Sequence, residues 1–430
     1  MVKRIVPSNV RDKIINLPSS KSIAHRALII LSFSAVRSKI YNVTFNDDVL
    51  ATIRVLKNLG IKFKKIDSST LEIDSSGVFL NTKNDFNVKE SGTTLRLLIP
   101  FLASLNEKIE IHTEGNLINR PLDVYEKLFN KDYDTLEIYK KDNLIKIHHR
   151  LIGDSFTVKG DVSSQFISGL LLYEALLLKS GELTVLKPFE SKAYVDLTVD
   201  MLSYFGFEFS VQDNKEAVYY RLKKTPVRLH SYNEYRVEAD YSSLAFLIAL
   251  GTINNDLTLK GVNQISLQAD RKIIDILQRM GGKISFVNKD ELSVKKSTLT
   301  PAIIDLKECP DLGPILMAVA STISGKTRFI NTKRLAYKES DRAKAMKDEL
   351  EKLGAKVTIK DNEIIVEGVK ELPKGEIFES HNDHRITMSL AVIATILKTP
   401  SYFKNTDCVK KSYPEFFNDL EKLGIGVKNA

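Results

Sequence analysis

The 430-residue sequence predicts an α/β protein of two similar domains, each built from three copies of one β/α unit. Three observations support this fold class. The chain is too long for one ordinary hydrophobic core, so two domains are expected. An amphipathic helix that ends in glycine recurs along the chain. Paired short strands follow most of these helices, which favours mixed sheets over a purely parallel, doubly wound sheet.

The repeated helix is seen in five segments. They are DDVLATIRVLKNLG (47–60), SKAYVDLTVDMLSYFG (191–206), QADRKIIDILQRMGG (268–282), ESDRAKAMKDELEKLG (339–354) and SYPEFFNDLEKLG (412–424). Their apolar residues recur at helical spacing, and glycine accepts a left-handed C-cap at little cost. The segments recur about every 70 to 75 residues, except for a double gap between the first two. RPLDVYEKLFNK (120–131), in the middle of that gap, is a degenerate sixth copy, so six units are predicted.

Composition narrows the classes of function. The net charge of +9 comes from 63 basic residues that are mixed with acidic ones and form no dense block. A nucleic-acid-binding repeat protein would need clustered cations and an aromatic platform, so this alternative is disfavoured. Most of the charge is expected on a solvated surface, with a few cations reserved for a small acidic substrate.

Targeting and redox signals are also informative. Residues 1–17 lack the continuous apolar segment of a secretory signal. The longest apolar stretches, near 167–178 and 244–250, are shorter than the roughly 20 residues of a membrane helix. Cys309 and Cys408 form no disulfide framework and have no metal-ligand spacing. We therefore expect a cytoplasmic protein with no membrane partner and no bound metal.

The segment LPSSKSIAHRALII (17–30) is the first candidate for chemistry. A Pro-Ser-Ser turn precedes Lys21 and Ser22, and Arg26 follows one helical turn after Ser22. Backbone N–H groups at a helix start favour an anion, and the two cations add charge. An ordinary N-capped helix with exposed cations is the alternative interpretation.

Three further segments present polar groups before helices. ESGTTLRLLIPF (90–101) places Gly92 in a small-residue turn through which a ligand can approach the backbone. GDVSSQFISGLLL (160–172) offers Ser163, Ser164 and Gln165, and NRPLD places Arg120 before a helix-starting proline. Each segment, taken alone, fits an ordinary helix cap equally well.

The segment YKESDRAKAM (337–346) gathers Lys338, Glu339 and Arg342 at a helix start. Lys338 and Arg342 are neighbours on a helical surface, and such a cation pair is unfavourable unless an anion lies between them. An exposed, charged helix face is the alternative. This segment, taken alone, fits both interpretations equally well.

One more segment completes a set of six, and two further places add single residues. SHNDHRITMSL (380–390) places His384 and Arg385 before an apolar helix, and His381 with His384 makes no complete metal site. CPDLGP places Asp311 in a loop, and Lys411 precedes SYPEFF. Six loops that present cations, hydroxyls or carboxylates at related helix starts predict a site for a polyanionic ligand.

The ordered motif set resembles one family. LPSSKSIAHR, NDDV, SGTTLR, NRP, VSSQF, ESKAYVD, EADYSS, YKESDR, NDHR and KKSYPEF occur in the order seen in the 3-phosphoshikimate 1-carboxyvinyltransferase (EPSP synthase) family, from about residue 14 to 418. The resemblance implies two domains, each of three βαβαββ units, in the inverse α/β-barrel-like enolpyruvyl transferase fold. It also implies a discontinuous domain, 1–18 with 238–430, around an inserted domain, 19–237, with the active site in the interdomain cleft.

The resemblance further implies transfer of the enolpyruvyl group of phosphoenolpyruvate to the 5-hydroxyl of shikimate 3-phosphate. The implied contacts to shikimate 3-phosphate are Lys21, Ser22, Arg26, Ser163, Ser164, Gln165, Ser191, Asp311 and Lys338. Those to phosphoenolpyruvate are Lys21, Gly92, Arg120, Gln165, Arg342, Arg385 and Lys411. Arginine suits a carboxylate and lysine suits a phosphate, which agrees with these assignments.

The reaction needs a base for the 5-hydroxyl proton and an acid for the methylene carbon of phosphoenolpyruvate. We expect Asp311 to be the base and Glu339 the acid, with Lys21 assisting proton transfer. The family resemblance requires neither a metal nor an organic cofactor, and we expect a monomer.

Two positions depart from the family pattern, and one rival family shares the fold. Arg334 and Glu90 both stand where asparagine is common. Arg334 is therefore carried over only weakly as a ligand, and Glu90 leaves open the inhibitor response and the local phosphoenolpyruvate contacts. UDP-N-acetylglucosamine enolpyruvyltransferases use a mobile-loop cysteine, and Cys309 and Cys408 are the candidates here. A buried, inert thiol is expected for both, and the KSIAHR, KESDR and NDHR set favours the shikimate enzyme.

Overall fold

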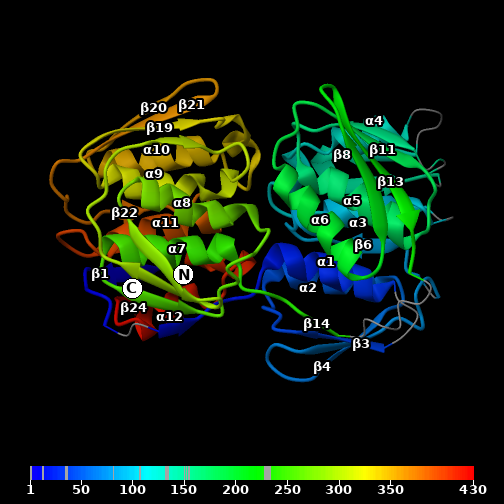
Figure 1. Ribbon diagram of the computed structural model, residues 1–430, viewed down its shortest axis with the longest axis horizontal. Helices are drawn as coiled ribbons and strands as arrows, with labels where there is room; N and C mark the ends of the chain where they lie inside the picture. Colours follow the sequence, from blue (N-terminus) through cyan, green and yellow to red (C-terminus); the bar gives the residue numbers. More distant parts are fainter. Residues whose placement is uncertain are drawn as a thin grey trace. The chain divides into compact units, whose positions relative to one another are not determined.

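The computed structural model describes residues 2–11, 14–33, 37–80, 82–105, 108–130, 135–149, 151, 153, 155–226 and 234–430. The chain folds as two compact units (Figure 1). One, here called the discontinuous unit, joins Met1–Pro18 to Glu238–Ala430, and the other, the inserted unit, is Ser19–Val237. In the described ranges, every helix is too short or too polar to cross a bilayer.

Six four-stranded sheets share one topology, with three in each unit. An edge strand pairs in parallel with its neighbour, and two antiparallel strands follow. In the inserted unit the sheets are β14(Glu234–Arg236)-β3(Arg37–Tyr41)-β5(Leu71–Asp74)-β4(Lys62–Lys65), β6(Asp85–Asn87)-β7(Ile109–His112)-β9(Leu144–Ile147)-β8(Leu136–Tyr139) and β10(Phe156–Lys159)-β11(Glu182–Leu186)-β13(Ala217–Lys224)-β12(Glu208–Asp213). The predicted mixed sheets are confirmed.

The discontinuous unit repeats this arrangement. Its sheets are β2(Ile14–Asn16)-β15(Leu257–Lys260)-β17(Glu291–Lys295)-β16(Lys283–Asn288), β18(Ile303–Asp305)-β19(Gly325–Ile330)-β21(Glu363–Gly368)-β20(Lys356–Ile359) and β22(Ile377–Phe378)-β23(Ser401–Phe403)-β1(Lys3–Val6)-β24(Gly426–Asn429). In the last sheet, β1 lies between β23 and β24 and pairs antiparallel with both. Strands from opposite regions of the sequence therefore complete one sheet.

Each place where the chain passes from one unit to the other is preceded by an edge strand. β2 ends shortly before Pro18 and pairs in parallel with β15, whereas β14 ends just before Val237 and pairs in parallel with β3. The Asp240 N–H donates to the Pro18 carbonyl oxygen at 2.9 Å, which ties the two passages together on the discontinuous side. β2 and β14 are thus edge strands, and the other three strands of each sheet come from the same unit.

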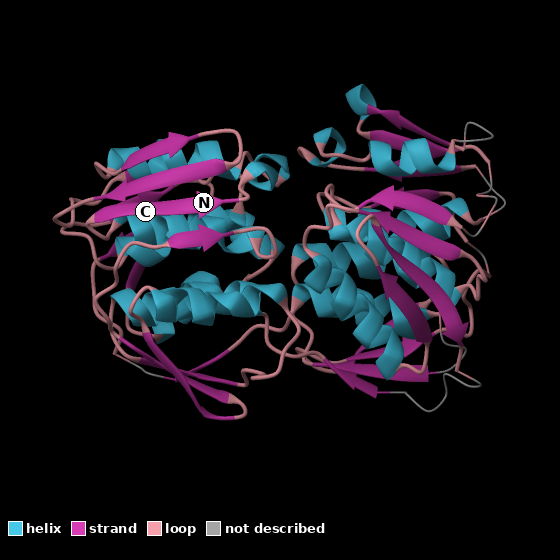
Figure 2. Ribbon diagram, turned by 45° about the horizontal axis from the view of Figure 1, so that its top comes forward, coloured by secondary structure: helices cyan, strands magenta, loops and turns pink. Residues whose placement is uncertain are grey.

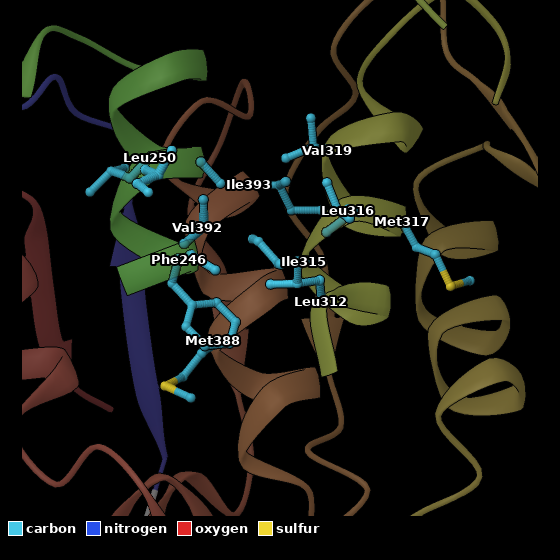
Figure 3. Close-up of a cluster of buried hydrophobic side chains, with 14 of the residues drawn as sticks. Phe246, Leu250, Leu312, Ile315, Leu316, Met317, Val319, Met388, Val392 and Ile393 are labelled. Carbon is cyan, nitrogen blue, oxygen red and sulfur yellow. The ribbon is translucent and has the colours of Figure 1, made fainter. Parts of the chain in front are cut away.

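Three apolar helices form the centre of each unit, and in Figure 2 the sheets cover them from outside. In the inserted unit they are α1 (Lys21–Ser32), α3 (Gly92–Ala103) and α5 (Ser164–Leu176), and all 12 residues of α3 are buried. In the discontinuous unit they are α7 (Tyr241–Ile253), α9 (Gly313–Ser321) and α11 (His384–Ala394). Figure 3 shows side chains of these last three helices meeting in the core. A helix that is apolar all round is stable only when buried in this way.

The six amphipathic helices are the predicted repeats. They are α2 (Asp47–Asn58), α4 (Asp123–Phe129), α6 (Lys192–Tyr204), α8 (Lys272–Arg279), α10 (Arg342–Lys352) and α12 (Phe416–Lys422). Glycines with positive φ follow five of them, namely Gly60, Gly206, Gly281, Gly354 and Gly424, which confirms the predicted left-handed ends. The helix expected from residue 339 begins later, at Arg342, because Asp341 is its N-cap and accepts from the Lys344 N–H.

Candidate active site

The predicted ligand residues stand at helix starts in both units. In the inserted unit, the side chains of Ser20, Ser91 and Ser163 cap α1, α3 and α5 by accepting backbone N–H groups. In the discontinuous unit, Asp240 caps α7 and Asp383 caps α11 in the same way. A capped helix start still presents N–H donors and positive potential, so these repeated positions suit anions.

Lys21 is the first residue of α1, and its Nζ lies 2.9 Å from Oδ2 of Asp48 in α2. Its side chain is 15% exposed, so the ammonium group remains accessible to a ligand. A chain of hydroxyl groups lies behind this pair: His25 Nδ1 is 2.6 Å from Thr52 Oγ1, which is 2.7 Å from Thr94 Oγ1. These bonds fix α1, α2 and α3 relative to one another and so fix Lys21.

His25 is fully buried, and its pKa is lowered well below the ordinary value. Burial is the main cause, and the nearby positive charges of Lys21 and Arg26 add to it. The ring is therefore neutral and serves the hydroxyl chain as a hydrogen-bonding group rather than as a cation.

Arg26 belongs to α1, and its buried side chain donates hydrogen bonds to neutral oxygen atoms. Its Nε donates to Thr198 Oγ1 at 2.7 Å, NH1 to the Ser22 carbonyl at 2.8 Å, and NH2 to Ser168 Oγ and the Tyr194 carbonyl, both at 3.1 Å. Burial lowers its pKa to about 10. The guanidinium group therefore ties α1 to α5 and α6 and positions Ser22, while its direct contact with a ligand stays a prediction.

Gly92 lies under two arginine side chains. A Cβ atom at this position would be 3.0 Å from NH1 of Arg120 and 3.2 Å from NH1 of Arg96. Arg96 donates to Gln165 Oε1 at 2.9 Å and to the Pro121 carbonyl at 3.1 Å, and its guanidinium carbon lies 5.2 Å from the Phe166 ring centre. The missing side chain of Gly92 thus gives two cations room at the start of α3.

Gln165 links this arginine pair to α5. Its Nε2 donates to Thr93 Oγ1 at 2.9 Å, while its backbone N–H donates to the Ser163 side chain at 3.3 Å. Ser164 is buried as the first residue of α5. Ser191, the N-cap of α6, is buried with a φ of 52°, a left-handed conformation that is uncommon for serine. The inserted unit thus brings its predicted residues to the starts of α1, α3, α5 and α6.

Arg342 organises the other group of residues, in the discontinuous unit. Its side chain is 1% exposed and pairs with three carboxylates: Asp311 Oδ1 at 2.8 Å, Glu339 Oε2 at 2.6 Å and Asp383 Oδ2 at 2.8 Å. We call Asp311, Lys338, Glu339, Arg342, Asp383 and Arg385 the arginine–carboxylate cluster. One guanidinium group therefore joins the predicted base and the predicted acid.

Asp311 lies in a short 3-10 turn, Pro310–Leu312, with its side chain 23% exposed. Lys338 Nζ lies 3.0 Å from its Oδ1, and Arg385 donates to its Oδ2 at 3.2 Å. Burial alone would raise the pKa of Asp311, but Arg385, Lys338 and Arg342 together hold it well below the usual range. The anion expected between Lys338 and Arg342 is thus a protein carboxylate.

Lys338 is the second perturbed group in the cluster. Burial lowers its pKa to about 8, Asp311 opposes this shift, and Arg334 and Arg342 add to it. Arg334 lies in the turn Lys333–Tyr337, which immediately precedes Lys338. A lysine with this pKa changes its charge close to neutral pH, so the cluster responds to pH through Lys338.

Three more positions from the sequence lie outside the arginine–carboxylate cluster as defined above. Lys411 is buried at the end of the turn Thr406–Lys411, which packs on α11. The Glu90 carboxylate lies against Gly115, where an added Cβ would be 1.4 Å from its Oε1. His381 Nε2 lies 2.9 Å from Glu349 Oε1, away from the predicted ligands.

The cysteines behave as packing residues. Cys309 is fully buried, and burial raises its pKa well above the ordinary value. Cys408 is only half-buried, which corrects the expected full burial, and burial raises its pKa to about 11. Both thiols therefore stay protonated and unreactive. No group of three or more His, Cys, Asp or Glu side chains in the described ranges is arranged to hold a metal ion.

Sequence reasoning left several participants unassigned. Asp48, Arg96 and Thr93 contact predicted residues of the inserted unit, and Asp383 contacts Arg342. Asp48 and Asp383 lie inside the quoted motifs NDDV and NDHR, at helix starts equivalent to those of the assigned residues. The equivalence of repeat positions was the signal that could have identified them.

The family model described as EPSP synthase (3-phosphoshikimate 1-carboxyvinyltransferase) matches residues 6–420. A 3-phosphoshikimate 1-carboxyvinyltransferase of Clostridium perfringens (strain ATCC 13124) is 38% identical over 424 residues, with 98% of this chain and 97% of that protein covered. The protein of that name from Clostridioides difficile is 38% identical over 436 residues, with the same coverage.

Two solved structures are similar in fold. An EPSP synthase of Acinetobacter baumannii matches with a TM-score of 0.78 at 23% identity, and each chain is covered completely. The enolpyruvyl transferase NikO of Streptomyces tendae matches with a TM-score of 0.74 at 16% identity, covering 99% of this chain and 98% of that one. At these identities the two structures support the two-domain α/β fold.

Proposed function

The chain belongs to the EPSP synthase (3-phosphoshikimate 1-carboxyvinyltransferase) family, and on this premise we propose how its residues perform that reaction. The enzyme is a transferase, EC 2.5.1.19, of the shikimate pathway and of aromatic amino acid biosynthesis. It transfers the enolpyruvyl group of phosphoenolpyruvate to the 5-hydroxyl of shikimate 3-phosphate and releases phosphate.

We assign shikimate 3-phosphate mainly to the inserted unit. Its ligands there are Lys21, Ser22, Arg26, Ser163, Ser164, Gln165 and Ser191, with Asp311 and Lys338 from the other unit. The support is chemical: an accessible ammonium group and serine residues stand at the starts of α1, α5 and α6. Phosphate and sugar-like hydroxyls are bound by such groups.

Phosphoenolpyruvate is assigned to cations of both units. Its ligands are Lys21, Gly92, Arg120, Gln165, Arg342, Arg385 and Lys411. The close packing of Arg120 over Gly92 supports this assignment, because a planar guanidinium group there can bind a carboxylate through two hydrogen bonds. Arg342 can reach a ligand only by exchanging one of its three carboxylate partners.

The proton transfers are assigned to Asp311, Glu339 and Lys21. Asp311 takes the proton of the 5-hydroxyl as that oxygen attacks C2 of phosphoenolpyruvate, and Glu339 gives a proton to the methylene carbon. The tetrahedral intermediate then regains its double bond by losing a proton from the new methyl group and expelling phosphate, while Lys21 assists proton transfer. The observation that carries this proposal is the single Arg342 guanidinium group that contacts both carboxylates.

The low pKa of Asp311 must change before it can act as a base. An anionic ligand that draws Arg385 and Lys338 away from Asp311 would remove the two positive charges that lower its pKa most. Its proton affinity would then rise, because fewer cations favour the ionised form. Ligand binding and base activation are thus coupled in this proposal.

We also propose that the two units are the domains of the enzyme, 1–18 with 238–430 and 19–237, and that both sets of residues act on the same ligands. The enzyme is further proposed to work as a cytoplasmic monomer without metal or cofactor. Sedimentation at assay concentration tests the monomer. If Lys21→Ala and Arg385→Lys both raise KM for phosphoenolpyruvate, residues of both units bind one donor.

The activity is tested by phosphate release from purified protein. Release is expected only when shikimate 3-phosphate and phosphoenolpyruvate are both present. Replacement of shikimate 3-phosphate by UDP-N-acetylglucosamine is the control for the rival family, and release with that acceptor alone would overturn the proposal. Asp311→Asn and Glu339→Gln should each reduce turnover by about a hundredfold or more if they transfer protons.

A further inference from the structure

The fourth repeat unit, built on α7 and α8, supplies none of the predicted site residues. Each of the other five repeats places such residues at the start of at least one of its two helices. At the equivalent places, the fourth repeat carries Ser242 in the first turn of α7 and Asp270 in the turn Ala269–Arg271 that leads into α8. Its motif EADYSS was noted in the sequence but received no role. These two residues are therefore candidates for an unassigned part of the site.

Asp270 lies beside the arginine–carboxylate cluster. Its side chain is buried, Ser242 Oγ donates to its Oδ2 at 2.5 Å, and NH1 of Arg385 lies 4.0 Å from the same oxygen. Its Oδ1 is buried and accepts no hydrogen bond from any residue in the described part of the chain. Arg385 also donates to Asp311, so two carboxylates face this one guanidinium group.

Four acids and several cations lie close together in this region. Ion pairs connect three cations, Lys338, Arg342 and Arg385, with four carboxyl groups, Asp270, Asp311, Glu339 and Asp383. Arg334 adds a positive charge near Lys338, so the acid that takes up a proton is identified by its hydrogen bonds rather than by a count of charges. The ionised form of Asp270 is poorly stabilised, because its buried Oδ1 accepts no hydrogen bond from the described residues.

The surroundings of Asp270 agree with this conclusion. Burial, followed by the charge of Asp311, raises its pKa to about 6, although Arg385 and the Ser242 hydroxyl act in the opposite direction. The titratable and charged groups that face it come from α7, from the segment before α9 and from α11. They are Asp240, Cys309, Asp311 and Arg385.

We propose that Asp270 is a positioning residue for Arg385. Ionised Asp270 holds the Arg385 guanidinium group while the site is empty. When an anionic ligand binds, Asp270 takes up a proton from solvent and releases the guanidinium group to the ligand. The proposal rests on the proposed function in one respect, that the anion is phosphoenolpyruvate. Ionised Asp270 and the ligand compete for the same guanidinium group, whereas neutral Asp270 does not compete. Since ionisation increases with pH, KM for phosphoenolpyruvate should rise as pH increases above about 6.

The experiment is a pH series of steady-state kinetics, from about pH 5.5 to 8.5, on wild type, Asp270→Asn and Ser242→Ala. The ionisation of the ligand affects all three proteins equally. The ratio of a variant's KM to that of wild type therefore reports only the ionisation of protein groups. At pH 5.5, Asp270→Asn should have a KM close to that of wild type. At pH 8, its KM should be about threefold to tenfold lower, since a one-unit pKa change on binding corresponds to tenfold. The effect is expected in KM rather than in kcat.

Ser242→Ala provides a second test that does not depend on the stability of Asp270→Asn. It removes the donor that stabilises ionised Asp270, so the rise in KM should begin at higher pH than in wild type. Asp275→Asn is the matched control, because it removes one exposed carboxylate from α8, the helix that follows the Asp270 turn, and should follow wild type.

Three results would overturn the proposal: an equal increase of KM at every pH in Asp270→Asn, an unchanged pH profile in Ser242→Ala, or the Asp270→Asn profile appearing in Asp275→Asn. A wild type that is inactive with both substrates would instead overturn the proposed function. The two failures are therefore distinguishable.

Discussion

The two units hold the guanidinium groups of their buried arginine residues by different means. In the inserted unit, Arg26 is bound by hydroxyl and carbonyl oxygens, and the hydrogen bonds described for Arg96 also go to neutral oxygens. In the discontinuous unit, Arg342 is bound by three carboxylates. Neutral acceptors fix a guanidinium group without cancelling its charge, whereas carboxylates cancel the charge and can also exchange protons.

This difference suggests that the two units contribute different properties to the reaction. The inserted unit keeps positive potential that suits a polyanion, and the discontinuous unit keeps paired acids and cations whose protonation can change. Variants that remove a charge should therefore affect binding and catalysis in the inserted unit, whereas in the discontinuous unit they should affect stability and pH dependence as well. Four predictions test the comparison.

The largest effect is expected from Arg342→Met. It leaves Asp383, which is completely buried, and Glu339 without their shared cation. Breaking a buried ion pair in this way should cost about 3 to 5 kcal/mol of stability, measured by urea denaturation with a probe in the discontinuous unit. Arg328→Met is the control, because its pair with Glu363 is half exposed and should contribute less than about 1 kcal/mol. A loss no larger than the control would contradict the structural role.

Lys21→Ala tests the inserted unit. Its loss removes the cation at the start of α1 and leaves Asp48 unpaired. Turnover should fall by roughly a hundredfold or more if Lys21 assists proton transfer, as determined by phosphate release at saturating substrates. The exposed Lys57→Ala serves as the control on α2. Near-normal turnover in Lys21→Ala would exclude the proposed role.

Gly92→Ala should have an intermediate effect. The added methyl group would lie 3.0 Å from Arg120 NH1, so the guanidinium group must move. We expect KM for phosphoenolpyruvate to rise about tenfold, because a bidentate contact is sensitive to such displacement. A double-mutant cycle with Arg120→Lys checks the cause. Fully additive effects would show that the methyl group acts elsewhere.

Lys338 should produce the smallest effect and a pH signature. Its pKa is lowered to about 8, so its charge is lost as pH rises through this value. KM for shikimate 3-phosphate should therefore rise several-fold between about pH 7.5 and 9. Lys338→Arg, which remains charged, should lack this rise. A rise that persists in the arginine variant would assign the pH dependence to another group.

Lys338 also affects stability, with a sign that can be worked out. The pKa of lysine in the unfolded chain is about 10.4, above the folded value of about 8. Between these values the unfolded state binds more protons, so this residue makes the protein more stable as pH rises from 8 toward 10. The same pH change therefore weakens binding while it favours folding.

Local features were predictable from sequence because they depend on neighbouring residues. The glycine-terminated helices, the hairpins and the polar helix starts each depend on a short segment, and repetition fixed their number. The edge strands β2 and β14 had no such signal, because each completes a sheet that lies far along the chain. The roles of Asp383 and Asp270 were hidden for the same reason, since Asp383 meets Arg342 across 41 positions and Asp270 meets Arg385 on another helix.

The strand β1 has a consequence for how the protein is made. It lies between β23 and β24, so the sheet that contains it cannot close until β24 has left the ribosome. All strands of the inserted unit precede residue 237, so that unit can complete its sheets first. Translation proceeds at about 5 to 20 residues per second, so synthesis of the chain after residue 237 takes roughly 10 to 40 s. The sheet that contains β1 is therefore completed that much later than the last strand of the inserted unit is made. During synthesis, the first-made strand is thus among the last to find its place.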